Sequence, residues 1–502
     1  MKIKEPRLQE LFDYLSKLNQ TAYRDEWMLA NDVLAKDPTC GDILNRYFSG
    51  NPPLPPGPAF QCLKLLECYG KNLVWFATYL LKALVVRFLG SGFKPPRDAD
   101  DLVLIDSFFL CNKIAQEQQY QEIYFPGLEK VLKEKGRAYA FTPQFSQAHN
   151  PRTFWEAFKV LKKSGIPLLT EFHVLRGTDY LRALLFLFFY PWRVMRLARR
   201  LPVGEPEPWV RFALWDTLDR IRVSGFLRLL YGRRLSRLPF RRIQCISWFE
   251  NQSTNKCFYR GLRHVPGKVF LQGAQFFIWP PTHLNIHVDP REIPFGVVPD
   301  VVLVNGPFYL EDESPVCFKV GLALRYQGLF TCRPDPRNAQ AILVVMSYWE
   351  YEIETVLDFL RKAELEAPLI IRFHPNTNVD RYLHRLPPSL ELDRGDRFRT
   401  LERVRLIVGA ASGLMVEGAS LGIPVLAIVK PTYLSHNYFP DLGRGLLWDR
   451  VEEPEDLKKM VERFGEILEE REDEVQRMAR QYRELFFAPP REEDFARVFE
   501  LS

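Results

Sequence analysis

The stretch "VGAASGLMVEGASLGIPVLAI", Val408 to Ile428, has the order of an apolar strand, a turn of small residues, a helix, a Gly-Ile-Pro turn and a second apolar strand. The small residues of the first turn let a bound group approach the backbone where the helix begins. Free N–H groups and the helix dipole favour a phosphate at such a helix start. The stretch therefore predicts a Rossmann-like unit with an anion site at its turn.

A second stretch, "LIIRFHPNTN" from Leu369 to Asn378, runs an apolar strand into His374 and Pro375. In doubly wound sheets the ligand lies beyond the carboxyl ends of the strands. The proline restricts the backbone, so the imidazole is expected at the edge of the sheet. There it can donate a hydrogen bond to a phosphate or a leaving group, or it can simply pair with a neighbouring backbone carbonyl.

The same alternation of strands and helices covers most of the chain and predicts an α/β protein. Apolar strand segments occur at 102–106, 138–142, 166–170, 243–249, 268–273, 300–306, 341–346, 369–373, 404–409 and 425–429. They form two series, which predicts two Rossmann-like domains. We expect a helical region over 1–95, one domain over 96–330 and a second over 331–502 that ends in charged helices packed across both domains.

Composition fits a folded chain that binds an anion. The 502 residues carry a formal net charge of +6 and are 47% hydrophobic. A mild positive charge suits an anionic ligand or an acidic membrane face, although a solvated surface explains it equally well. No basic-aromatic motif indicates nucleic acid. The eight cysteines show no CxxC pair and the N-terminus has no secretion-signal pattern, so we expect reduced thiols and a cytoplasmic location.

Two apolar runs raise the question of membrane contact. "NLVWFATYLL" (Asn72 to Leu81) and "ALLFLFFYPW" (Ala183 to Trp192) are each about half of the roughly 20 residues that span a bilayer. A basic cluster, "RVMRLARRL", follows the second run. This order predicts peripheral contact of residues 180–201 with the inner membrane, with an ordinary core helix as the alternative. Contact of residues 72–89 stays open.

The turn of the first stretch supplies most of the residues expected to bind the nucleotide. Ala411, Ser412 and Gly413 form the proposed anion site, and Ser412 also suits a helix cap. Glu417 lies one helical turn further on and can accept hydrogen bonds from a ribose, or it can face solvent. Lys430 follows the last strand, where it either helps to hold phosphate or faces water.

The His-Pro strand end, the Ser-containing turn and the "EGASLGIPVL" helix together resemble the nucleotide-binding domain of GT-B glycosyltransferases. The resemblance is greatest to bacterial surface-polysaccharide enzymes of the polysialyltransferase-like and capsule Kdo transferase-like groups. It implies that His374, Pro375, Ser412 and Gly413 bind the phosphate of the nucleotide. The present chain departs from that pattern by having Ala-Ser in place of a Ser-Ser pair.

The first domain is expected to hold the acceptor. In "WFENQSTNK" a strand end presents Glu250, Asn251 and Gln252, and the carboxylate can serve as a general base, as a nucleophile or as a helix cap. Later strand ends offer Gln275 and Asn305 for sugar or acceptor hydroxyls.

Arg325, in "GLALRYQGLF", can neutralise a carboxylate or phosphate of the donor or form an interdomain salt bridge. Asp106 is expected to cap a turn or helix. The order along the chain of the motifs that contain Glu250, Gln275, Asn305 and Arg325 resembles a family of surface carbohydrate biosynthesis proteins.

No metal site is predicted. His283 and His287 have helical spacing, but prolines 280, 281 and 290 oppose a long helix, and the chain has neither HExxH nor a GxxxxGK[ST] loop. We expect a GT-B glycosyltransferase without a tightly bound cofactor, using a nucleotide-sugar co-substrate and a glycan or lipid-linked acceptor. A CMP-linked acidic sugar such as Kdo or sialic acid is the preferred donor. The alternatives are a UDP-sugar or CDP-polyol transferase, a nucleotide-sugar 2-epimerase and a noncatalytic scaffold for glycan assembly.

Overall fold

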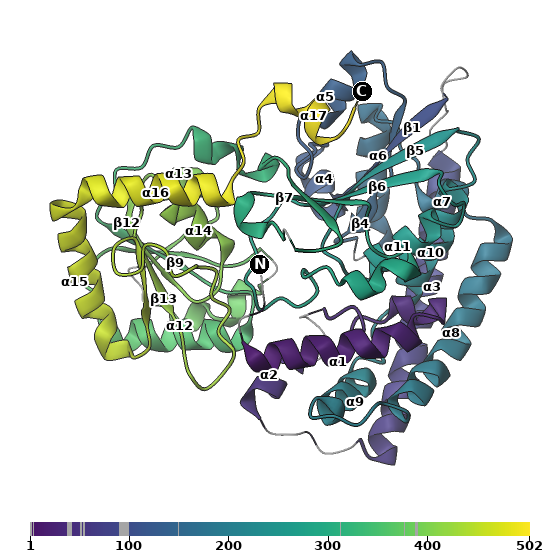
Figure 1. Ribbon diagram of the computed structural model, residues 1–502, viewed down its shortest axis with the longest axis horizontal. Helices are drawn as coiled ribbons and strands as arrows, with labels where there is room; N and C mark the ends of the chain where they lie inside the picture. Colours follow the sequence, from purple (N-terminus) through teal and green to yellow (C-terminus); the bar gives the residue numbers. More distant parts are fainter. Residues whose placement is uncertain are drawn as a thin grey trace.

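The computed structural model contains two six-stranded parallel sheets, one in each half of the molecule (Figure 1). It describes residues 3, 5–37, 43–50, 53, 56–89, 100–148, 150–311, 313–375, 377–386 and 390–501. The expected GT-B architecture of two Rossmann-like domains, with an N-terminal helical extension and a C-terminal crossover helix, is confirmed.

The first sheet has the strand order β3-β1-β5-β6-β7-β8. Its strands are β1 (Asp101–Asp106), β3 (Tyr139–Phe141), β5 (Arg242–Trp248), β6 (Val269–Gln275), β7 (Val301–Val304) and β8 (Cys317–Val320). β2 (Phe108–Leu110) and β4 (Gln144–Ser146) pair separately beyond its carboxyl edge. The strand expected at 166–170 is reduced to one parallel bridge, Leu168 to Phe141, at the outer edge.

The second sheet has the order β11-β10-β9-β12-β13-β14, which is the Rossmann order 3-2-1-4-5-6. Its strands are β9 (Ala341–Val345), β10 (Leu369–Arg372), β11 (Glu391–Leu392), β12 (Val404–Gly409), β13 (Val425–Ile428) and β14 (Trp448–Val451). The register pairs Val345 with both Arg372 and Gly409. The three central strands therefore end at one level, and the residues that follow them emerge at the same depth.

Helices cover both sheets, as the alternation of segments predicts. In the first half they are α1 (Pro6–Ala22), α2 (Ile43–Ser49), α3 (Pro58–Leu89), α4 (Cys111–Glu117), α5 (Leu128–Glu134), α6 (Pro151–Ser164), α7 (Glu171–Val174), α8 (Gly177–Ala198), α9 (Glu207–Asp216), α10 (Val223–Leu235) and α11 (Ser253–Leu262). In the second half they are α12 (Glu350–Ala363), α13 (Arg397–Leu401), α14 (Gly413–Ala419), α15 (Pro454–Glu470), α16 (Glu472–Phe486) and α17 (Phe495–Val498). Residues 31–37, expected to be helical, form turns instead.

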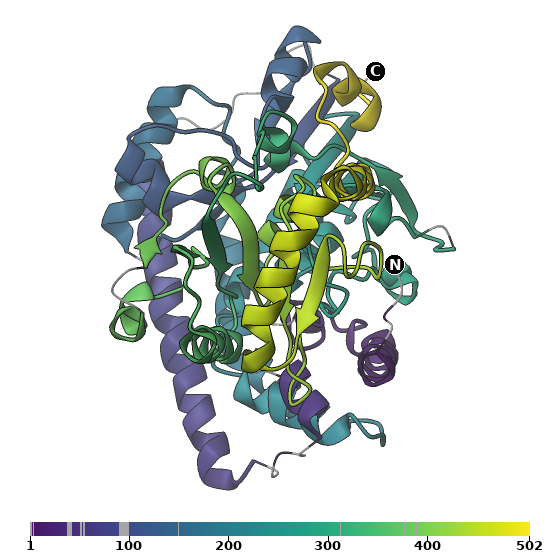
Figure 2. The ribbon, with the colours of Figure 1, turned by 90° about the vertical axis from the view of Figure 1, so that its left-hand side faces the viewer.

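The C-terminal segment returns to the first domain. α16 leads out of the second domain, and α17 packs against α5 beside the C-terminus (Figures 1 and 2). Asn305 holds the crossing segment, because its side-chain amide donates to the Phe486 carbonyl at 2.8 Å and its backbone carbonyl accepts from the Ala488 N–H at 2.8 Å. Residues 487–501 therefore pack with the first domain, although the sequence assigned them to the second.

The expected ligand role of Asn305 is corrected by the same contacts. Its side chain is fully buried between β7 and the crossing segment, where no acceptor hydroxyl reaches it.

α10 and α11 approach each other so closely that their backbones touch. A Cβ added to Gly232 would lie 2.5 Å from the Phe258 carbonyl oxygen and 2.8 Å from the Leu262 nitrogen. We expect Gly232→Ala to destabilise the protein by about 3 kcal/mol, measured by urea unfolding, because both obstacles are backbone atoms. Gly70→Ala, in α3 with open space around it, is the matched control and should be neutral or slightly stabilising.

Candidate active site between the two sheets

Side chains that follow the strands of the second sheet gather at its carboxyl edge. His374 comes two residues after β10, and its ring meets the Tyr348 ring edge-on at 5.2 Å. Burial lowers the pKa of His374, so the imidazole is neutral at pH 7 and carries one N–H. The His-Pro pair thus follows β10 at the level where the neighbouring strands β9 and β12 also end.

The small-residue turn after β12 packs against the first domain. The Ser412 hydroxyl accepts from the Leu414 N–H at 3.3 Å, which caps α14. A Cβ on Gly413 would lie 3.1 Å from the Cβ of Ile278, so a larger residue there would need Ile278 to shift by a few tenths of an ångström. Ala411 is buried, whereas Ser412 and Gly413 are half-buried. Phosphate binding at this turn stays a prediction.

Two other residues that were predicted to bind the nucleotide lie at the border of the carboxyl edge of the second sheet. Pro375 is exposed beside His374. The ammonium of Lys430 lies 5.9 Å from the centre of the Phe359 ring, on α12, and its backbone N–H donates to the Ser435 hydroxyl at 3.2 Å. Lys430 therefore leans toward α12, and a direct role with phosphate also stays a prediction.

Glu250, after β5 of the first sheet, is held by two donors. Its carboxylate accepts from the Trp248 indole at 2.8 Å and from the Gln252 amide at 3.1 Å. Burial raises the pKa of Glu250, and the hydrogen bond from Trp248 and the charge of Arg325 oppose this rise only in part. Arg325 stacks over the Trp248 ring at 5.3 Å. The result is a proton-accepting carboxylate beside a guanidinium.

Glu417 lies across the domain boundary from Glu250. It is 5% exposed and forms an ion pair with Arg397 at 2.8 Å, so the solvent-facing alternative is wrong. Burial raises its pKa against the charges of Arg397 and Arg325. Arg397 also donates to the Arg325 carbonyl at 2.7 Å. The charge of Arg325 thus opposes the rise in pKa of both carboxyl groups, and we name Glu250, Arg325, Arg397 and Glu417 the charged centre.

Two predicted sugar-binding residues support the charged centre from behind. The amide of Asn251 donates to the Asn285 carbonyl at 2.6 Å, and that of Gln275 donates to the Ile286 carbonyl at 3.1 Å. Both side chains are buried, so their expected contact with hydroxyl groups of a ligand is corrected. Asn285 in turn donates to the Glu250 carbonyl at 2.7 Å. These amides therefore position the loop that carries Glu250.

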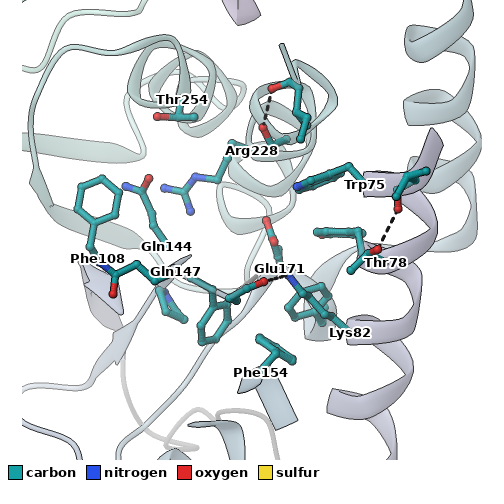
Figure 3. A pocket seen from close by; sticks show the side chains of 18 of the residues that line it. Trp75, Thr78, Lys82, Phe108, Gln144, Gln147, Phe154, Glu171, Arg228 and Thr254 are labelled. Atoms are coloured by element: carbon teal, nitrogen blue, oxygen red, sulfur yellow. Dashed lines mark hydrogen bonds between the residues drawn. The ribbon is translucent and has the colours of Figure 1, made fainter. Parts of the chain in front are cut away.

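A cavity of about 850 Å³ lies at the carboxyl edge of the first sheet, beside the loop that carries Glu250. Gln252, which binds the Glu250 carboxylate, is one of its lining residues. Its walls come from α3, α6, α7, α10, α11 and the loops after β1 and β3; they include Trp75, Thr78, Lys82, Phe108, Gln144, Phe154, Glu171, Arg228 and Thr254 (Figure 3). We name it the aromatic cavity. Apolar walls with a few polar groups are typical of a ligand site.

None of the charged side chains of this cavity was selected from the sequence; they include Glu171 and Arg228. Arg228 and Glu171 lie between the α3 residues and Gln144 in Figure 3. Burial raises the pKa of Glu171 to about 7, although Arg228, Tyr79 and Lys82 favour its charged form. Glu171 directly follows the 166–170 segment, so the strand-end rule that selected Glu250 also applies to it.

Asp106 does not cap a turn or helix. It forms a buried ion pair with Arg228 at 2.7 Å and accepts from the Ser247 hydroxyl at 2.8 Å. The pair fixes Arg228 at the inner end of the aromatic cavity.

A further contact between the domains centres on His436, which the sequence analysis also missed. Its Nδ1 lies 2.7 Å from the Thr282 hydroxyl of the first domain, and its Nε2 lies 3.1 Å from the Tyr351 hydroxyl. The rings of His436 and His283 are 5.3 Å apart. Within the described ranges, no three His, Cys, Asp or Glu residues are placed to hold a metal ion. The cluster joins the domains by neutral hydrogen bonds.

Glu352, beneath His436, makes stability depend on pH. Burial raises its pKa from 4.5 to about 7, against hydrogen bonds from Ser347 and the His436 backbone. The folded protein binds this proton more tightly than the unfolded chain, so the stabilising contribution is complete below pH 4.5 and is lost as the pH rises through about 7.

Glu352→Gln should therefore reduce the loss of unfolding free energy between about pH 5 and about pH 8 by about 2–3 kcal/mol. Urea unfolding of both proteins across this range measures it. If the unfolding free energies of the two proteins changed in the same way with pH, Glu352 would have the same pKa in the folded protein as in the unfolded chain.

No protein-family model and no curated protein matches the chain. The solved structures that resemble it include MurG of Acinetobacter baumannii, with 13% identity, coverage of 80% of this chain and 100% of that one, and a TM-score of 0.42. The glycosyltransferase SnogD from Streptomyces nogalater has 14% identity, 80% and 100% coverage and a TM-score of 0.41. MnaA of S. aureus, solved with UDP, has 12% identity, 80% and 98% coverage and a TM-score of 0.43. At this similarity their chemistry does not transfer to the present chain.

Proposed function

We propose that the chain transfers a sugar from a nucleotide-activated donor to an acceptor held in the aromatic cavity. The observation that carries the proposal is the charged centre: a carboxylate with a raised pKa lies beside guanidinium groups where the carboxyl edges of two Rossmann-like domains meet. A base next to cations is what the attack of a hydroxyl on a phosphate-activated sugar requires.

Each group has a defined task in this reaction. Glu250 accepts the proton of the acceptor hydroxyl, whose oxygen bonds to the anomeric carbon. The bond from that carbon to the donor phosphate oxygen breaks, and the phosphate leaves with the electron pair. Arg325 and Arg397 neutralise the charge that develops on the phosphate, and the neutral His374 donates a hydrogen bond to it. A raised pKa brings Glu250 closer to the working pH, where a general base is most effective.

The donor is proposed to be a CMP-activated acidic sugar, as the resemblance in sequence implies. Two guanidinium groups in the charged centre suit a donor that carries a carboxylate in addition to its phosphate. A UDP-sugar or a CDP-polyol is the alternative donor.

A thermal-shift panel of CMP, UDP, GDP and CDP tests the proposal. The preferred nucleotide should stabilise the protein by about 2.7 kcal/mol at a concentration 100 times its Kd. A raised melting temperature with CMP alone supports the acidic-sugar donor, and a shift with UDP alone redirects the donor to a UDP-sugar. Glycan binding by calorimetry without any nucleotide effect would instead indicate a noncatalytic scaffold.

The aromatic cavity beside Glu250 favours transfer over epimerisation, because a 2-epimerase needs no second substrate. Incubation with a UDP-sugar and no acceptor, followed by NMR, separates these reactions. Appearance of the 2-epimer would contradict a transferase; slow release of the free sugar by hydrolysis is compatible with it.

A further inference from the structure

α3 and α8 lie side by side on the first domain, on the side away from the second domain (Figure 1). The Tyr69 hydroxyl donates to the Phe188 carbonyl at 3.0 Å, and the Tyr79 ring contacts the Tyr180 ring at 6.2 Å. Residue numbers rise along one helix as they fall along the other, so the pair is antiparallel. A groove of about 320 Å³ runs between them, lined by Leu80, Leu84 and Tyr180 among others.

The outer faces of both helices are apolar and exposed. On α3 the exposed residues include Leu66, Leu73, Leu81, Leu84 and Phe88, of which Phe88 is 82% exposed. On α8 they are Leu181, Leu185, Phe188, Phe189 and Trp192. A stripe of this size on two adjacent helices exceeds the scattered apolar residues of an ordinary surface. We name it the α3–α8 face.

Charge on this face is predominantly positive, and Glu67, which follows Leu66 on α3, pairs with Lys64 at 3.5 Å. Residues 68–89 and 180–198 contain no Asp or Glu, whereas they contain Lys71, Lys82, Arg87, Arg182, Arg193 and Arg196. Lys71 pairs with Asp219 and Arg193 with Asp25, both from neighbouring segments, and Lys82 lines the aromatic cavity. The exposed cations Arg87, Arg182 and Arg196 remain beside the apolar side chains. A second copy of the chain would bring these cations against one another, whereas an anionic lipid surface complements them.

A cavity of about 960 Å³ continues this pattern at the C-terminal end of α8. Its lining includes Phe189 and Trp192 together with Lys17, Arg196 and Arg200, and its acidic lining residue, Asp25, is paired with Arg193. Apolar walls beside several cations match the acyl chain and phosphate of a phospholipid.

α3 meets the length and composition of a membrane-spanning helix, and it is the one such helix in the part of the chain that the structure describes. Its other face, however, packs on the domain through Asn72, Phe76, Tyr79, Ala83 and Val86. The helix therefore presents one apolar face outward, as a helix lying in the plane of a lipid surface does.

We propose that the α3–α8 face docks flat on an anionic lipid bilayer. Gly70 and Val74 lie at the border of this face and also line the aromatic cavity, so docking places the mouth of that cavity at the membrane surface. If the proposed transferase function holds, the acceptor of this site is lipid-linked. Docking itself does not depend on that function.

Sedimentation of the full chain with vesicles tests the proposal. Binding is expected to vesicles of phosphatidylcholine with phosphatidylglycerol, to be weak with phosphatidylcholine alone, and to fall at high salt. Phe88→Glu combined with Trp192→Glu should weaken binding by about tenfold or more. Arg196→Gln combined with Arg200→Gln should weaken it by about thirtyfold at low salt.

Leu383→Glu is the matched control, because Leu383 is an exposed leucine of the second domain and should leave vesicle binding unchanged. Melting temperatures establish that every variant folds. Nucleotide binding by the Phe88→Glu, Trp192→Glu protein should equal that of the wild type, so failure of docking and failure of the transferase proposal are separate results.

Three results of these measurements would overturn docking, and a fourth comes from extraction of membranes. They are no binding to any vesicle, equal binding by the Phe88→Glu, Trp192→Glu protein, and a dimer in light scattering that this double variant dissolves. Release from membranes by detergent but not by high salt or alkaline carbonate would also overturn it, because α3 would then span the bilayer.

Discussion

Glu250→Gln is expected to lower the rate of sugar transfer by about 10²- to 10⁴-fold, the usual contribution of a general base. The substitution keeps the shape of the side chain, and its amide oxygen can still accept from the Trp248 indole, which binds the carboxylate at 2.8 Å. The variant should therefore fold normally and retain nucleotide affinity within a few-fold. Initial rates with labelled donor, together with calorimetric titration of the nucleotide, measure both quantities.

Glu366→Gln is the control for this experiment, since Glu366 pairs with Lys458 on the far surface of the second domain. It should leave the transfer rate unchanged. A Glu250→Gln protein that transfers sugar as fast as this control would remove Glu250 from the reaction.

Glu292→Gln is expected to destabilise the protein by about 3–5 kcal/mol, because it leaves the buried Lys256 ammonium without its carboxylate and the buried Lys36 ammonium with Asp289 alone. Glu292 is 1% exposed, pairs with Lys36 at 2.9 Å and also binds Lys256. Burial alone would raise the pKa of Glu292, but these two lysines hold that pKa below its ordinary value. The network ties residues 31–37 to α11, whose first turn follows Gln252. Urea unfolding measures the change.

Glu391→Gln offers the matched comparison on the surface. Glu391 binds Arg403 with two contacts, at 3.0 and 2.7 Å, but both side chains are more than half exposed. Its loss should cost less than about 1 kcal/mol. Equal losses for the two variants would show that the buried network contributes no more than a surface pair.

Most of the sheet architecture was predictable because parallel strands covered on both faces are continuous apolar runs. Segments such as "AILVV" in β9 and "VLAI" in β13 have this pattern, and each is a strand. β8, "CFKV", lies at the edge of its sheet with alternating exposure and was missed. β14, "WDRV", is another edge strand, and it was missed because its two central residues are charged.

The strand-end rule located His374 and Glu250, because it depends only on where an apolar run stops. It failed to separate ligand groups from supporting groups. Asn251, Gln275 and Asn305 follow strands in the same way, yet each donates to a backbone carbonyl in the interior. The sequence does not distinguish an Asn or Gln that contacts a ligand from one that binds a backbone carbonyl.

The partners in the charged centre were not accessible from sequence. Arg397 pairs with Glu417, although the sequence places it in a segment with no recognised motif. Arg325 was selected, but its effect on the pKa of both Glu250 and Glu417 depends on how the two domains pack. The raised pKa of Glu171 likewise arises from burial by α3 and α10, which only the folded chain brings together.

The central claim is that a nucleotide binds at the carboxyl edge of the second sheet with His374 as one of its donors. Calorimetric titration of the preferred nucleotide into His374→Ala and into His384→Ala tests it most directly, because His384 is an exposed histidine of the same domain. We predict at least a tenfold rise in Kd for His374→Ala, as expected for a lost hydrogen bond to a charged group, and no change for His384→Ala. Equal affinities of both variants and the wild type, or no nucleotide binding by the wild type, would contradict the claim.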